Sequence, residues 1–143
     1  MKAIRAVSVL LLFSAAAAFA QGAPKVEVYK NANCGCCGGW VEHMRESGFE
    51  VVTHDVADVA VERKKLGMPE PLGSCHSAKI GGYVIEGHVP AADIRRLLKE
   101  KPNAVGLTVP GMVPSSPGMA GPKTAYDTLL VARDGTTRVF ASH

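Results

Sequence analysis

The sequence predicts a mixed α/β fold, and three observations support this class. The chain has 143 residues, a length that suits one hydrophobic core. From residue 25 to residue 67, stretches with strand-like alternation are followed by stretches with helical spacing of apolar residues. Near the C-terminus, an Asp-Gly turn signal separates two β-rich stretches. We therefore expect a small central sheet flanked by helices and completed by a C-terminal β-hairpin.

The first half of the chain contains two predicted strands and two predicted helices. The strands show alternating or β-forming residues, and the first helix repeats apolar residues at helical spacing. Gly48 and Gly67 supply the left-handed residue that often follows a helix. In chain order the elements are a strand over residues 25–29, a helix from Cys36 or Cys37 to Gly48, a strand over residues 49–54, and a helix from a cap at Asp55 or Asp58 through Leu66.

The second half is predicted to contain a third strand, a third helix and the hairpin. A glycine-rich turn leads into the strand, and Pro90 suits the first position of the helix, which has one apolar face. Prolines and glycines exclude regular structure between the helix and the hairpin. These elements are a turn and strand over residues 81–87, a helix from Pro90 past Leu98, a loop over residues 109–122, and hairpin strands over residues 128–132 and 137–140.

The first twenty residues are typical of a secretory signal. Lys2 and Arg5 precede an apolar stretch, and Ala18-Phe19-Ala20 matches the small-x-small pattern of a signal-peptidase site. The stretch is short and rich in alanine for a membrane span. We predict cleavage after Ala20, which leaves residues 21–143 as a single domain with no membrane attachment. An uncleaved anchor is the alternative.

The charge of the remaining chain argues against nucleic acid as a partner. Removing Lys2 and Arg5 lowers the formal charge from +3 to +1. The short basic runs, Arg63-Lys64-Lys65 among them, fall on predicted helices and are interpreted as solvated faces. All four cysteines lie beyond the signal, so they function in an oxidising compartment.

Three of the cysteines, Cys34, Cys36 and Cys37, stand where the first strand gives way to the first helix. Free backbone N–H groups and the helix dipole stabilise anions there, and the pKa of such a thiol can fall from about 8.5 to roughly 3.5–7.5. A thiolate is both the nucleophile of disulfide exchange and a ligand for soft metals. The position therefore supports either chemistry.

Two structural disulfides are the simplest alternative for four cysteines in an exported domain. Of the three pairings, one needs a vicinal bridge and one pairs Cys34 with Cys36 across a single glycine. The third, Cys34 with Cys37 and Cys36 with Cys75, is sterically the easiest. Every pairing closes at least one very small loop and so constrains the unfolded chain little.

A metal site is the other interpretation of the cluster. The fold can bring Cys75, with His76 beside it, next to the first helix, and four thiols exceed what a two-electron switch needs. Zinc would favour two separated C-x-x-C pairs, and export makes iron–sulfur assembly unfavourable. Thiolates together with the thioethers of Met112 and Met119 favour Cu(I), although both methionines can equally fill gaps against the sheet.

Four motifs together resemble the CopG-like periplasmic copper-resistance proteins, a family described as a metal-binding domain of unknown function. They run in order over nearly all of residues 25–143, and Val113 after Met112 is a departure from the proline expected there. The resemblance implies a thioredoxin-like fold and copper bound by the thiolates of Cys34, Cys36, Cys37 and Cys75. The motifs are Cys34 to Cys37 with Trp40, Gly73-Ser74-Cys75-His76, Gly82 to Pro90, and the two Pro-Gly-Met tripeptides ending at Met112 and Met119.

The histidines receive different interpretations. His76 adjoins Cys75 and is the best auxiliary ligand or proton acceptor, whereas His88 is expected to help begin the third helix. We expect His43 on the exposed side of the first helix, His54 in the second strand, and His143 at a disordered end.

Together these observations predict a periplasmic copper-binding protein that sequesters Cu(I) or hands it on, with one or several ions at the four-cysteine site. A periplasmic copper donor or acceptor protein would be its partner. The alternative is a thiol-disulfide oxidoreductase in which Cys34 attacks and Cys37 resolves, although Cys36 would then be an off-pathway thiol. A copper-redox enzyme that uses the same cysteines is also open, so the sequence does not decide whether the protein is an enzyme.

Overall fold

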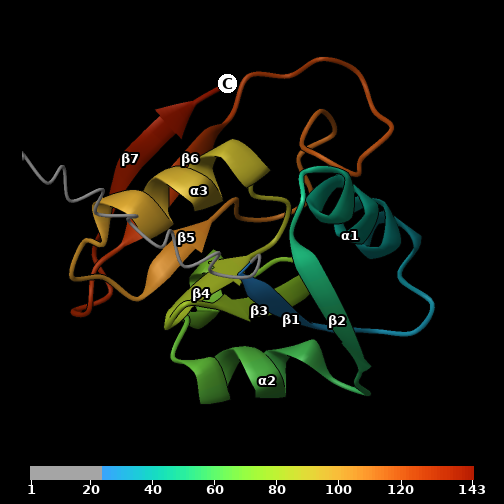
Figure 1. Cartoon of the computed structure of the whole chain (residues 1–143), viewed down its shortest axis with the longest axis horizontal. Coiled ribbons are helices and arrows are strands. Elements are labelled where there is room, and N and C mark those ends of the chain that lie inside the picture. The colour runs from blue at the N-terminus through green and yellow to red at the C-terminus, as the bar shows by residue number, and fades with distance from the viewer. Residues whose placement is uncertain (1–23) are drawn as a thin grey trace, which may run out of the picture.

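The structure is a computed structural model that describes residues 24–143. The predicted signal segment lies outside this range. These residues form a seven-stranded mixed sheet in the order β2-β1-β3-β4-β5-β6-β7 (Figure 1). The β1–β2 and β4–β5 pairs are parallel and the other four are antiparallel. Among the described residues, no helix has the length and apolar character that crossing a membrane requires.

The order of elements confirms the predicted α/β class and the C-terminal hairpin. Every predicted strand and helix is present, with bounds that shift by a few residues. The elements are β1 (Lys25–Lys30), α1 (Gly35–Glu46), β2 (Glu50–Asp55), α2 (Val59–Leu66), a 3-10 turn η1 (Glu70–Leu72), β3 (His76–Ile80), β4 (Tyr83–Glu86), α3 (Ala91–Glu100), β5 (Gly106–Thr108), β6 (Asp127–Val131) and β7 (Thr137–Ser142).

Two strands, β3 and β5, are absent from the sequence prediction, and the sheet is correspondingly larger than expected. β3 begins with the buried polar residues His76 and Ser77, so it lacks the alternation of a half-buried strand. β5 has three residues and contains Gly106, which would signal a break. A Cβ on Gly106 would lie 1.7 Å from the Val84 carbonyl oxygen, so this strand pair requires glycine.

The helix ends follow the expected chemistry, with one correction. Asp58 caps α2 by accepting the Ala60 N–H at 2.8 Å, and Gly67 ends it with φ of 84°. Pro90 is the capping residue of α3, and Ala91 is the first helical residue, so the predicted start is one residue early.

Two apolar clusters lie on opposite faces of the sheet. Helices α1 and α3 cover one face and α2 covers the other (Figure 1). The larger cluster joins Trp40 of α1 to Ile94 of α3 across strand residues such as Val28. Trp40 Nε1 also donates to the Val89 carbonyl oxygen at 2.9 Å, which fixes α1 against the chain that enters α3. This packing places the N-terminus of α1 beside the start of β3.

Candidate metal centre

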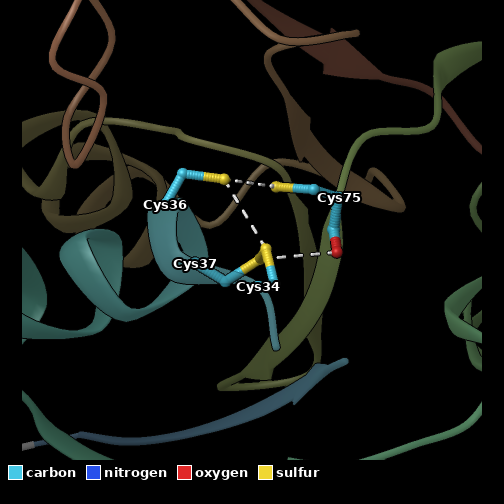
Figure 2. Close-up of side chains that lie close together, drawn as sticks. All are labelled: Cys34, Cys36, Cys37 and Cys75. Carbon is cyan, nitrogen blue, oxygen red and sulfur yellow. Dashed lines mark hydrogen bonds between the residues drawn. A yellow bond between two sulfur atoms is a disulfide. The ribbon is translucent and has the colours of Figure 1, made fainter. Parts of the chain in front are cut away.

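Four sulfur atoms, from Cys34, Cys36, Cys37 and Cys75, lie within 4.8 Å of one another. The first three stand at the start of α1, and Cys75 lies directly before β3 (Figure 2). Cys37 is buried, and the other three are partly buried. The structure therefore brings together the four cysteines that the sequence predicts to form one site.

Two of the four sulfurs are joined in a disulfide between Cys34 and Cys37. Cys36 and Cys75 are free thiols, and their sulfur atoms are 3.9 Å apart. Cys36 Sγ also lies 3.5 Å from Cys34 Sγ. In this oxidised form two thiols can act as ligands, and reducing the disulfide would make four available.

His88 contacts the site, which corrects the expectation that it serves mainly to begin α3. Its side chain is 1% exposed, and Nε2 lies 3.0 Å from Cys75 Sγ. Nδ1 lies 2.7 Å from the Pro117 carbonyl oxygen and must donate to it. In the neutral ring, Nε2 is then left as an acceptor facing the Cys75 thiol.

His76 also lies at the site, as predicted. Its Nδ1 is 3.5 Å from Cys75 Sγ, and its ring packs against those of Trp40 and His88. Its Nε2 is buried and has no hydrogen-bond partner among the described residues. Cys75, His76 and His88 form a second ligand group whose donor atoms lie within 4.8 Å of one another, so the Cys75 sulfur belongs to both groups.

Burial sets the protonation states in the metal-free protein. Desolvation, with His88 as a lesser cause, lowers the pKa of His76 to about 3, and burial also lowers the pKa of His88. Desolvation, followed by the nearby Cys36, raises the pKa of Cys75 to about 12. Near neutral pH the site thus presents two neutral imidazoles and a protonated Cys75, whose proton a soft metal ion can replace.

A buried ion pair holds the segment that carries Cys75. Arg63 Nε donates to Glu86 Oε1 at 2.9 Å, and the same oxygen accepts the Ser74 N–H at 2.7 Å. Arg63 Nη2 donates to the Ser74 carbonyl oxygen at 2.6 Å. A Cβ on Gly73 would lie 2.5 Å from Arg63 Cζ, so only glycine allows this approach. Arg63 is buried, which corrects its interpretation as part of a solvated basic face.

The loop over residues 109–122, which bears both methionines, runs along the site. Gly111 N donates to the Gly73 carbonyl oxygen at 3.1 Å, and the backbone of Gly118 packs against Gly39 of α1. Met112 is 49% exposed and Met119 is partly buried. Their role as copper ligands stays a prediction.

The other three histidines have structural contacts. His43 is partly buried, not exposed, and its Nε2 accepts the Ala91 N–H at 3.1 Å. His54 stacks on Tyr29 within the sheet. The terminal His143 is ordered against Asp93, with Nε2 and Oδ2 2.9 Å apart, so the expected disorder is wrong.

Comparisons with known proteins agree with the sequence motifs. A family model described as "Protein of unknown function, DUF411" matches residues 72–119. The solved structure named copper resistance protein CopG, Form 2, is 41% identical, with a TM-score of 0.80, and the match covers 85% of this chain and 98% of that one. Form 1 is 42% identical, with a TM-score of 0.77 and coverages of 83% and 96%. The chain belongs to the CopG copper-resistance family.

No curated protein matches the chain. The segment matched by the family model contains Cys75, both site histidines and both loop methionines, but not the three cysteines at the start of α1. The matches to the CopG structures cover 85% and 83% of this chain, well beyond the segment that the family model matches. Membership of the CopG family therefore rests on most of the chain and not on residues 72–119 alone.

Removing the cation from the buried ion pair is expected to destabilise the protein. In Arg63→Met, Glu86 stays buried without its charged partner, and the free energy of unfolding in urea should fall by about 3–5 kcal/mol. The control is Lys64→Met on the exposed side of α2, which should change it by less than about 0.5 kcal/mol. A loss below about 1 kcal/mol in Arg63→Met would show that the pair does not hold this segment.

Acid is expected to destabilise the metal-free protein through the buried histidines. His76 in the fold stays neutral down to about pH 3, whereas in the unfolded chain it takes a proton near pH 6.5. Between these values the unfolded state binds more protons, so stability falls as pH falls, by about 1.4 kcal/mol per pH unit for one histidine. Urea unfolding at pH 6.5 and pH 5 measures this difference.

The variant His76→Phe should make that acid dependence shallower, since it removes one of the two histidines that the fold keeps neutral. His54→Gln, which changes a histidine outside the site, should retain the dependence of the wild type. Equal wild-type stability at both pH values would contradict the assigned protonation states.

Proposed function

We propose that this protein binds Cu(I) as its cargo, in copper resistance or homeostasis, through the cysteine cluster and the two buried histidines. The observation that carries the proposal is the shared Cys75 sulfur, which lies within 4.8 Å of three other sulfurs and of two imidazole nitrogens. Thiolate ligands select soft ions such as Cu(I), and neutral imidazole also suits copper. Membership of the CopG family supports the same ion.

The donor set fits more than one copper ion. Reducing the disulfide consumes two electrons and leaves four thiols, to which His76 and His88 add two nitrogens. A sulfur that belongs to two ligand groups can bridge two ions. The unpartnered Nε2 of His76 and the neutral state of both rings suit them to metal binding. Met112 and Met119 are the candidate thioether donors of the loop beside the site.

We also propose a periplasmic location after cleavage at Ala20, with a copper donor or acceptor protein as partner. The signal-like N-terminus and the disulfide within the cluster support export to an oxidising compartment. A thioredoxin-like core is part of the proposal. It is supported by the β1-α1-β2 unit, with its cysteines where β1 leads into α1, and by β3 lying antiparallel to β1.

The disulfide favours a second candidate function, thiol-disulfide exchange. Cys34, partly exposed, and Cys37, buried at the same helix start, suit the roles of attacking and resolving cysteine. In that reaction the Cys34 thiolate attacks a substrate disulfide, and Cys37 then releases the reduced substrate. The free thiols of Cys36 and Cys75 have no part in this scheme.

Anaerobic titration with Cu(I) tests the main proposal. The reduced, metal-free protein should compete with a Cu(I) chelator of known affinity, and Cys75→Ser should weaken binding by at least about 100-fold because both ligand groups lose their common sulfur. His88→Gln should weaken it by about 10-fold or more, while His54→Gln serves as the matched control and should bind like the wild type.

The same titration tests whether all four cysteines contribute to Cu(I) binding. If the wild type binds Cu(I) no better than the double variant Cys36→Ser/Cys75→Ser, the four-cysteine site is wrong. Met112→Leu and Met119→Leu in parallel measure the contribution of each thioether, because leucine keeps the bulk and removes the sulfur.

Reduction of insulin by dithiothreitol tests the second candidate. If the protein is a thiol-disulfide oxidoreductase, turnover should survive in Cys36→Ser/Cys75→Ser and fall to the uncatalysed rate in Cys34→Ser. Wild-type turnover at the uncatalysed rate would rule out this activity on insulin and leave copper binding as the function to test.

A further inference from the structure

The cluster places a free thiol between a disulfide and a second free thiol. Cys36 Sγ is 3.5 Å from Cys34 Sγ, which belongs to the disulfide, and 3.9 Å from Cys75 Sγ (Figure 2). All four sulfurs lie within 4.8 Å of one another, so small side-chain movements suffice to exchange bonding partners. A structural disulfide would have no need of two further thiols at this distance.

We propose that the protein passes its disulfide from the Cys34–Cys37 pair to the Cys36–Cys75 pair, with Cys36 as the carrier. The result is a disulfide relay inside the cluster. The proposal does not rest on copper binding and concerns the metal-free protein.

Two exchange steps carry out the transfer. In the first, Cys36 attacks Cys34 Sγ, the Cys34–Cys36 bond forms, and the Cys34–Cys37 bond breaks with its electron pair on Cys37. In the second, Cys75 attacks Cys36 Sγ, the Cys36–Cys75 bond forms, and the electron pair leaves on Cys34. The protons lost by Cys36 and Cys75 end on Cys37 and Cys34. One disulfide and two thiols are present before and after, so the relay needs no external oxidant or reductant.

The fold holds the acceptor thiol in place for this exchange. Ser74, directly before Cys75, is fixed through its N–H by Glu86 and through its carbonyl oxygen by Arg63. Cys36 lies in the first turn of α1, whose position Trp40 fixes through its bond to Val89. Both sulfurs are thus carried by ordered backbone, and the approach between them does not depend on a chance loop movement.

The relay would give the site a capacity of two disulfides. Once the disulfide lies at Cys36–Cys75, the partly exposed Cys34 and the buried Cys37 are a dithiol again. That dithiol can react with a second disulfide of an external partner, which is reduced to two thiols while the Cys34–Cys37 bond forms again. The inferred partner class is therefore a disulfide-bearing molecule, with four electrons transferred per fully reduced protein.

Disulfide mapping of the full protein tests the relay. The reduced, metal-free protein receives one equivalent of oxidised glutathione, equilibrates for hours without oxygen, and is then blocked with N-ethylmaleimide and digested with trypsin. Cys34, Cys36 and Cys37 fall in peptide 31–45, and Cys75 falls in peptide 66–79. At least about a tenth of the disulfide should join the two peptides through Cys36, since pairs of similar strength share a disulfide in comparable amounts. A disulfide confined to peptide 31–45 in the wild type would overturn the proposal.

Two variants separate the steps. In Cys75→Ser only the first step can occur, so fragmentation of peptide 31–45 should find the disulfide shared between Cys34–Cys37 and Cys34–Cys36. In Cys36→Ser the two peptides should no longer be joined, and a link as abundant as in the wild type would show that Cys36 is not the carrier. Copper is absent throughout, so failure of the relay and failure of copper binding are distinguishable.

Discussion

The fully buried carboxylate of Glu86 is the constraint on which the positions of Cys75 and His88 depend. Two charges taken out of water destabilise a fold unless every oxygen and nitrogen finds a partner. Here the carboxylate accepts from Arg63, from the Ser74 N–H and from the Ser77 hydroxyl. Cys75 follows Ser74, and His88 lies two residues after Glu86. One satisfied ion pair therefore fixes the backbone beside the thiol and beside its imidazole partner.

Local sequence patterns predict the part of the site formed by the three cysteines at the start of α1. Three cysteines at a strand-to-helix junction share a helix start whatever the rest of the chain does, so their proximity follows from spacing. His88 required knowledge of β3, whose first residues are buried and polar. In the β3–β4 hairpin Ser77 pairs with Glu86, and continuing that register places Cys75 opposite His88. The turn at Gly81-Gly82 indicates a hairpin, but the pairing of Cys75 with His88 can be predicted only once β3 is recognised as the strand before that turn.

The burial and charge environment of a side chain cannot be predicted from the spacing of residues in the sequence. Arg63 stands in a basic run on a helix, as surface residues do, and only the tertiary fold aims its guanidinium at Glu86. The chemistry of Cys75 shows the same limit. A helix N-terminus lowers the pKa of a thiol, but Cys75 reaches the site from a strand, so burial dominates and the pKa rises. The class of donor was predictable from the sequence, whereas its protonation state was not.

Under the proposed function, copper and the disulfide use the same sulfur atoms, so binding of one excludes the other. A Cys34–Cys37 disulfide removes two of the four thiols, so Cu(I) that binds these thiols binds only the reduced form. Any ligand that favours one state stabilises it in proportion to its affinity, and the effect is reciprocal. Tight Cu(I) binding must therefore make the dithiol harder to oxidise, and oxidation must weaken copper binding to the same extent. Under the proposed function, formation of the Cys34–Cys37 bond in a more oxidising compartment would therefore release copper.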